Sequence, residues 1–148
     1  MSDRVLRCGY VSAVDYEKGY VKMTYPDLDD AVSDWLPMMT NGTEYKMPKV
    51  GQQMLAVHLP NGMDSGFVLG GYWSENDKPK STGNGVFRKD MGDGCYMEFK
   101  GGKLTIHASQ IELVADDVNV KSSSVNINGS STVELVGGSV TANGTPIG

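Results

Sequence analysis

The feature that most constrains this chain is a short repeat in its C-terminal third. Between residues 104 and 142 one unit recurs six times, and each unit has an apolar residue, a polar residue and a second apolar residue. The first four units begin at residues 104, 111, 118 and 125, seven apart, whereas the last two begin at 133 and 140. Coiled coils also repeat every seven residues, but their apolar positions stand three and four apart. Here they stand two apart, which is the period of a strand, so the repeat predicts a stack of short strands with polar corners.

One copy of this stack has no second layer to cover its apolar stripe. Its seven-residue units are also shorter than the coils of about 20 or more residues that single-chain solenoids use. The economical arrangement is several identical chains wound around one axis, and three chains give a triangular β-prism. The residues expected to face inward in the trimer core, called the eleven repeat residues below, are Leu104, Ile106, Ile111, Leu113, Val118, Val120, Val125, Ile127, Val133, Leu135 and Val140.

Residues 4–99 have a different pattern, in which short alternating runs are separated by turn residues. Strands are predicted at 5–14, 20–25, 34–37, 53–59 and 65–73, with Gly9 at a bulge or close approach and turns at 15–19 and 60–62. Five short strands without a helical period favour a small Greek-key barrel of the OB-fold type. The expected barrel core is Val11, Val14, Val21, Met23, Trp35, Leu36, Val57, Val68 and Leu69.

These patterns predict an all-β chain with three parts. The OB-like barrel occupies 1–75, a linker rich in polar residues, Gly and Pro occupies 76–85, and the C-terminal spike occupies 86–148. Residues 86–88 and 95–99, joined by 91–94, are expected to form a hairpin or the first rungs of the prism.

Composition narrows the class of protein. The 148 residues carry a net charge of −5, which gives no general attraction to nucleic acid or to anionic membranes. No apolar run approaches the ~20 residues of a membrane span, and Met1–Arg4 do not begin a signal peptide, so synthesis in the cytoplasm is expected. Cys8 and Cys95 have no metal-binding or redox spacing and are expected to be free thiols rather than a disulfide.

Candidate chemical groups are sparse. His58 and His107 have no ligand partners at metal-binding spacing, so structural roles are expected for both. The acidic run at 27–30 lacks the rest of a calcium loop, and Asp116 with Asp117 fits a turn, although cation binding there stays open. No catalytic triad or paired-carboxylate pattern is present, and we expect neither catalysis nor a cofactor.

Aromatic residues leave one alternative open. Trp35, Tyr72 and Trp73 could stack on bases or sugars, as OB barrels often allow. The negative charge of the chain, and the lack of Lys or Arg flanking these residues in the sequence, favour packing roles instead. The alternative function is therefore an OB-fold binding module for nucleic acid or glycan, with the prism as a trimerisation stalk.

A barrel followed by such repeats resembles the baseplate assembly protein V family, which forms the central spike of contractile phage tails and has relatives in R-type bacteriocins and type VI secretion spikes. The ordered motifs that carry the resemblance are Gly9-x-Val11, Val14-Asp15, Gly19-x-Val21, Tyr25-Pro26-Asp27, Trp35-Leu36-Pro37, Pro48-x-Val50-Gly51-Gln52-Gln53-Met54, Gly66-x-Val68-Leu69-Gly70-Gly71 and Asp93-Gly94.

The resemblance implies a homotrimeric structural protein that is made in the bacterial cytoplasm and becomes part of a virion or an extracellular tail-like particle. Its barrels would bind the baseplate hub and tail tube, and its prism would contact and pierce the target cell envelope. Six rungs at ~4.8 Å give a spike about 30 Å long, short for this family, which leaves a Gram-positive target open. Some family members bind a tip iron through His-x-His, which this sequence lacks. Closure of the tip is expected from Pro146 and Ile147, or from a separate capping protein.

Overall fold

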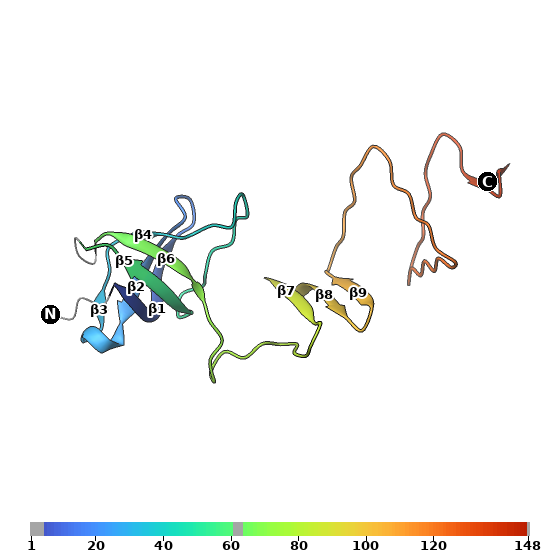
Figure 1. The fold of residues 1–148 in the computed structure, drawn as a ribbon. Coiled ribbons are helices and arrows are strands. Elements are labelled where there is room, and N and C mark those ends of the chain that lie inside the picture. Colours follow the sequence, from blue (N-terminus) through green and yellow to red (C-terminus); the bar gives the residue numbers. More distant parts are fainter. Residues whose placement is uncertain (1–4, 61–63, 148) are drawn as a thin grey trace. The chain divides into compact units, whose positions relative to one another are not determined.

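The all-β prediction is confirmed. The computed structural model describes residues 5–60 and 64–147, and these contain antiparallel sheets of six, three and two strands without an α-helix (Figure 1). By their internal contacts the described residues divide into two units, 5–88 with 98–104 and 89–97 with 105–147. Each sheet is therefore described by itself.

The six-stranded sheet is formed by the N-terminal half of the chain. Its strands are β1 (Leu6–Asp15), β2 (Tyr20–Tyr25), β3 (Ala31–Val32), β4 (Leu36–Pro37), β5 (Gln53–His58) and β6 (Gly66–Gly71). The strand order is β3-β2-β1-β5-β6, and β4 also pairs with β2. A 3-10 turn, η1 (Pro26–Leu28), follows β2. The strand expected at 34–37 is present only over Leu36–Pro37, and it ends as expected at Pro37, which cannot donate to a ladder. The expected turn at 60–62 falls largely outside the described residues.

The two edges of this sheet are connected by Met38 and Met39, which follow β4 and contact the edge strand β6. Met38 forms an isolated parallel bridge with Val68 of β6, and the Met39 N–H donates to the Val68 carbonyl at 2.8 Å. No closed barrel forms among the described residues, since this contact is one bridge rather than a ladder. The sheet is strongly curved, and one face encloses the core.

The core lies on one face of each strand. Its fully buried side chains are Val11, Val21, Met23, Tyr25, Leu36, Met54, Ala56 and Val68, with Val14, Leu28, Met38 and Met47 partly buried against them. Burial alternates along β2 and β5, as expected for strands with one covered face. Five of the nine expected core residues are thus fully buried, and Val14 lies at the edge of the core.

Three expected core residues lie elsewhere. Trp35 is 38% exposed, whereas its neighbour Leu36 is fully buried. Leu69 and Val57 are only partly buried, and the residues beside them, Val68 and His58, point inward instead. The physical reason is the same in each case, because successive side chains of a strand face opposite sides.

Glycine serves two distinct needs in this sheet. A Cβ on Gly9 would lie 2.5 Å from the Thr24 carbonyl oxygen, so β1 and β2 approach closely at this residue. The register shift itself falls later, between Val11 and Ala13. Gly19, in the turn from β1 to β2, has φ +73°, a conformation that glycine adopts without strain.

The remaining strands form two small sheets. The three-stranded sheet has the order β7 (Phe87–Gly92), β8 (Cys95–Lys100) and β9 (Lys103–His107), and β10 (Thr141–Ala142) pairs with β11 (Thr145–Pro146). The expected hairpin at 86–99 is present. Residues 72–86 contain no strand, and the predicted domain boundaries at 75 and 85 stay predictions.

Candidate assembly surface

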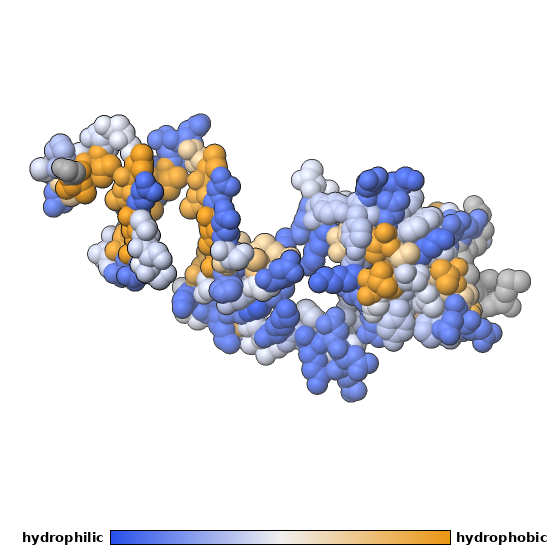
Figure 2. All heavy atoms as spheres, turned by 180° about the vertical axis from the view of Figure 1, so that it is seen from behind, coloured by the Kyte–Doolittle hydropathy of each residue, from blue (hydrophilic) through white to orange (hydrophobic). Residues whose placement is uncertain are grey.

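The repeat residues are exposed in the single chain. Ten of the eleven have more than half of their surface accessible, with Leu113 at 78% and Val120 at 72%, and only Val140 is partly buried. Figure 2 shows apolar atoms gathered along this extended segment. A row of exposed Val, Ile and Leu side chains is far from the usual surface of a soluble monomer, so this row is the strongest candidate for an interface.

The repeats from residue 108 to residue 140 form no strand within the chain. The sequence predicts a strand in each repeat, and the structure has strands only in the first and last of them, in β9 and β10. A strand needs a hydrogen-bonded neighbour, and a chain that runs once through the stack supplies none. Backbone donors and acceptors along 108–140 are therefore without ladder partners in the single chain.

The last repeat turns back on itself. Asn143 and Gly144 have φ of +50° and +77°, as in a type I′ turn, and Ile147 N–H donates to the Val140 carbonyl at 2.9 Å. This pairing puts Ile147 on the same face as Val140, whereas Pro146 pairs with Thr141 and lies on the other face. Of the two expected tip residues, the register thus brings only Ile147 beside the repeat residues.

The three-stranded sheet has one polar face. Arg88 Nη1 donates to Glu98 Oε2 at 3.2 Å, and the rings of Tyr96 and His107 stack with centroids 5.2 Å apart. Arg88, together with the Ser81 side chain, lowers the pKa of Glu98, Ser81 having the larger effect. His107 Nδ1 is also hydrogen-bonded to the Gly94 carbonyl at 3.0 Å. His107 thus has structural contacts, in line with the role expected for it.

The opposite face of this sheet is apolar. Because side chains alternate along a strand, the neighbours of the polar residues point the other way. These neighbours are Phe87, Met91, Cys95, Met97, Phe99, Leu104 and Ile106, called the apolar sheet face below, with Lys89 as the one charged residue among them. Of these residues, only Leu104 and Ile106 belong to the eleven repeat residues, and the signal for the others is the period-two pattern of 87–91 and 95–99.

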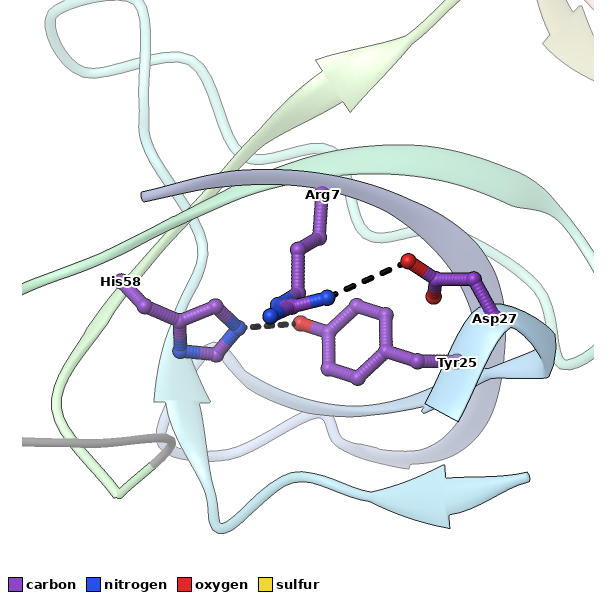
Figure 3. A network of polar contacts seen from close by, with 4 residues as sticks. All are labelled: Arg7, Tyr25, Asp27 and His58. Carbon is purple, nitrogen blue, oxygen red and sulfur yellow. Dashed lines mark hydrogen bonds and ion pairs between the residues drawn. The ribbon is translucent and has the colours of Figure 1, made fainter. Parts of the chain in front are cut away.

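A polar network joins residues of the six-stranded sheet to η1, and its Asp27 end is exposed (Figure 3). Arg7 Nη1 donates to Asp27 Oδ2 at 3.2 Å, and the Tyr25 hydroxyl shares a hydrogen bond of 2.6 Å with His58 Nε2. Burial raises the pKa of Tyr25 to about 12, an effect that Arg7 opposes and Asp27 reinforces. Burial also lowers the pKa of His58, and Nδ1 of this ring is buried without a hydrogen-bond partner of good geometry. The Tyr25–His58 end of this network is buried, whereas Arg7 and Asp27 line a cavity of about 400 Å³ at the surface.

The aromatic residues considered for stacking lie at the surface. Trp35 has the Lys22 ammonium 5.1 Å from its ring centroid. Tyr72 and Trp73 line a cavity of about 390 Å³ together with Lys46 and three methionines, Met38, Met47 and Met54. The structure thus corrects one sequence argument, since Lys side chains do accompany these aromatic residues in space.

Other kinds of site find little support. No group of three His, Cys, Asp or Glu side chains that could hold a metal ion occurs within residues 5–60 and 64–147. In the same part of the chain, no helix is long and apolar enough to cross a membrane. Cys8 and Cys95 are free thiols.

No protein-family model matches the chain, and neither does any curated protein.

Proposed function

We propose that this chain is the central spike of a contractile phage tail or of a related tail-like particle, a homotrimer without enzymatic activity. Its N-terminal sheet docks on the baseplate hub and tail tube, and its C-terminal prism meets and pierces the target cell envelope. Three chains from the cytoplasm of the producing bacterium assemble into the particle without a cofactor.

The strand pairing supports an OB-fold for the N-terminal part. β1 pairs with both β2 and β5, β2 pairs with β4, β5 pairs with β6, and the segment after β4 reaches β6 in parallel. OB-folds are five-stranded and partly open Greek-key barrels, which agrees with a curved sheet whose last contact is a single bridge.

The observation that carries the proposal is the exposure of the repeat residues on a segment with no strand pairing of its own. Residues 108–140 place large apolar side chains in water at every repeat and leave their backbone without ladder partners. Three chains around one axis satisfy both needs together. A prism of interwound chains unfolds only when the chains separate, so it resists load along its axis and has slow unfolding.

Light scattering on the purified protein tests this proposal. The expected mass is three times the 15.9 kDa of the chain, falling to one chain when the protein is truncated after Lys100. A full-length protein with the mass of one chain would remove the basis for the prism and for the spike.

The cavity beside Tyr72 and Trp73, and the Lys22 ammonium over Trp35, favour the OB-fold binding module as the second candidate. Fluorescence anisotropy with a labelled oligonucleotide, and the same measurement with a labelled glycan, separates the two. The spike predicts no binding, whereas salt-sensitive binding of the oligonucleotide or competable binding of the glycan supports the module.

A further inference from the structure

We propose that the apolar sheet face of β7, β8 and β9 is buried against the same face of two other copies of this chain. The interface between copies then begins at Phe87 rather than at Leu104, and the three-stranded sheet forms one wall of the prism. This inference rests on the proposed function and adds a part of the interface that the repeats do not include.

The first support is the separation of the two faces. On the polar face Arg88 pairs with Glu98, and Tyr96 stacks on His107, so these side chains satisfy one another within a single chain. The other face has seven apolar residues and Lys89. A sheet that has a polar and an apolar face normally covers the apolar one.

The second support is the lack of any layer that covers this face. Phe87 is 58% exposed, Met91 55% and Phe99 44%, and no residue of the three strands is fully buried. Apolar side chains that stay in water do not contribute the free energy that their burial would give. In the single chain, the apolar sheet face therefore remains exposed to water.

Continuity identifies a second copy as the occupant. Leu104 and Ile106 belong both to the apolar sheet face and to the first of the six repeats. Whatever covers the repeat residues therefore also covers β9, and β8 and β7 follow in the same sheet. With Lys89 as its one charged residue, the face offers little for charge pairing with a foreign partner, whereas copies of itself match it in chemistry.

The arrangement places the two thiols of the chain in different surroundings. Cys95 stands on the apolar sheet face and becomes buried between copies, whereas Cys8, on β1, is exposed. A small thiol reagent therefore reports on this face without any substitution, and Cys8 shows that the reagent reaches the native protein.

Labelling of the wild-type protein with N-ethylmaleimide, followed by peptide mass spectrometry, is the test. Cys8 is expected to react in the assembled protein, and Cys95 to react at least about tenfold more slowly than it does in urea. Rapid labelling of Cys95 in a protein of three-chain mass would overturn this inference and leave the proposed function standing. A one-chain mass would refute the proposed function, and this inference with it.

A pair of neighbouring substitutions gives a second, independent test. Phe99→Asp puts a carboxylate on the apolar sheet face and is expected to raise the labelling rate of Cys95 severalfold. Lys100→Asp, on the polar face, changes the charge by more and is expected to leave that rate unchanged. Equal effects of the two changes would contradict the assignment of the faces.

Discussion

Val120→Asp is the most direct perturbation of the interface. Val120 is the second apolar residue of the third repeat and is 72% exposed in the single chain, so its surface is available to partners. Asn119 is its neighbour and faces the opposite side of the same predicted strand. Asn119→Asp therefore adds the same charge to the same repeat on the outward face, and it is the matched control.

The expected cost of Val120→Asp has two parts. Burying a valine contributes about 1.5–3 kcal/mol, and the 72% of its surface still exposed corresponds to about 1–2 kcal/mol per chain, or ~3–6 kcal/mol per trimer. The substitution also brings three carboxylates to one level of the axis. At separations of ~5–8 Å and an effective dielectric constant of about 20, each pair repels by about 2–3 kcal/mol. A loss on the order of 10 kcal/mol per trimer is enough to separate the chains.

Size-exclusion chromatography with light scattering measures the outcome. Val120→Asp is expected at the 15.9 kDa of one chain and Asn119→Asp at three times that mass. The near-ultraviolet circular dichroism of Trp35 and Trp73 should be unchanged in both, because these residues belong to the N-terminal part. If Val120→Asp stays trimeric, or if both variants dissociate alike, the assignment of inward and outward faces is wrong.

The remaining predictions concern the six-stranded sheet. Burial lowers the pKa of His58 below its usual value near 6.5, so the unfolded chain binds the proton more readily. Stability against urea should therefore fall as the pH drops through about 6.5 towards the folded pKa, and it should fall less in His58→Gln, as followed by tryptophan fluorescence. Gly66 and Gly70 have φ of +154° and +155°, but only a Cβ on Gly66 would collide, 2.0 Å from the Val57 carbonyl oxygen. Gly66→Ala should lower the urea midpoint much more than Gly70→Ala, and equal midpoints would contradict the clash.

The sequence predicts this fold well where apolar and polar residues alternate strictly. In β2, Val21, Met23 and Tyr25 stand two apart, and all three are fully buried. Where two apolar residues are adjacent, composition cannot say which one faces the core. The prediction placed both residues of two adjacent pairs in the core, Trp35 with Leu36 and Val68 with Leu69. Successive side chains face opposite sides, so only one residue of each pair can be buried there.

Polar residues of the core were beyond sequence reasoning for a different reason. His58 and Arg7 are 5% and 8% exposed, and each is hydrogen-bonded to a residue of another element, His58 Nε2 to Tyr25 and Arg7 to Asp27. Charged and polar side chains are rarely buried without such partners. Because these partners are 33 and 20 positions away along the chain, nothing local in the sequence marks either residue as internal.

The candidate assembly surface was largely predictable, since its signal is the repeat itself. For the three-stranded sheet, the sequence predicted that 86–88 and 95–99 form a hairpin or the first rungs of the prism. It did not assign the faces, because Lys89 interrupts the alternation between Phe87 and Met91. Only the contacts between Arg88 and Glu98 and between Tyr96 and His107 show which side chains share a face.

The spacing of the repeats has a consequence for how three chains find their correct alignment. Identical units seven residues apart would let one chain slide by a whole unit and still match apolar to apolar. The eight-residue interval between Val125 and Val133, and the reversal at Asn143 and Gly144, occur once each. If one chain slipped by one unit, its eight-residue interval would lie beside a seven-residue interval of the next chain. Its turn at Asn143 and Gly144 would also no longer lie beside the same turn of the other chains. In the proposed trimer these two irregularities would allow only one alignment of the three chains.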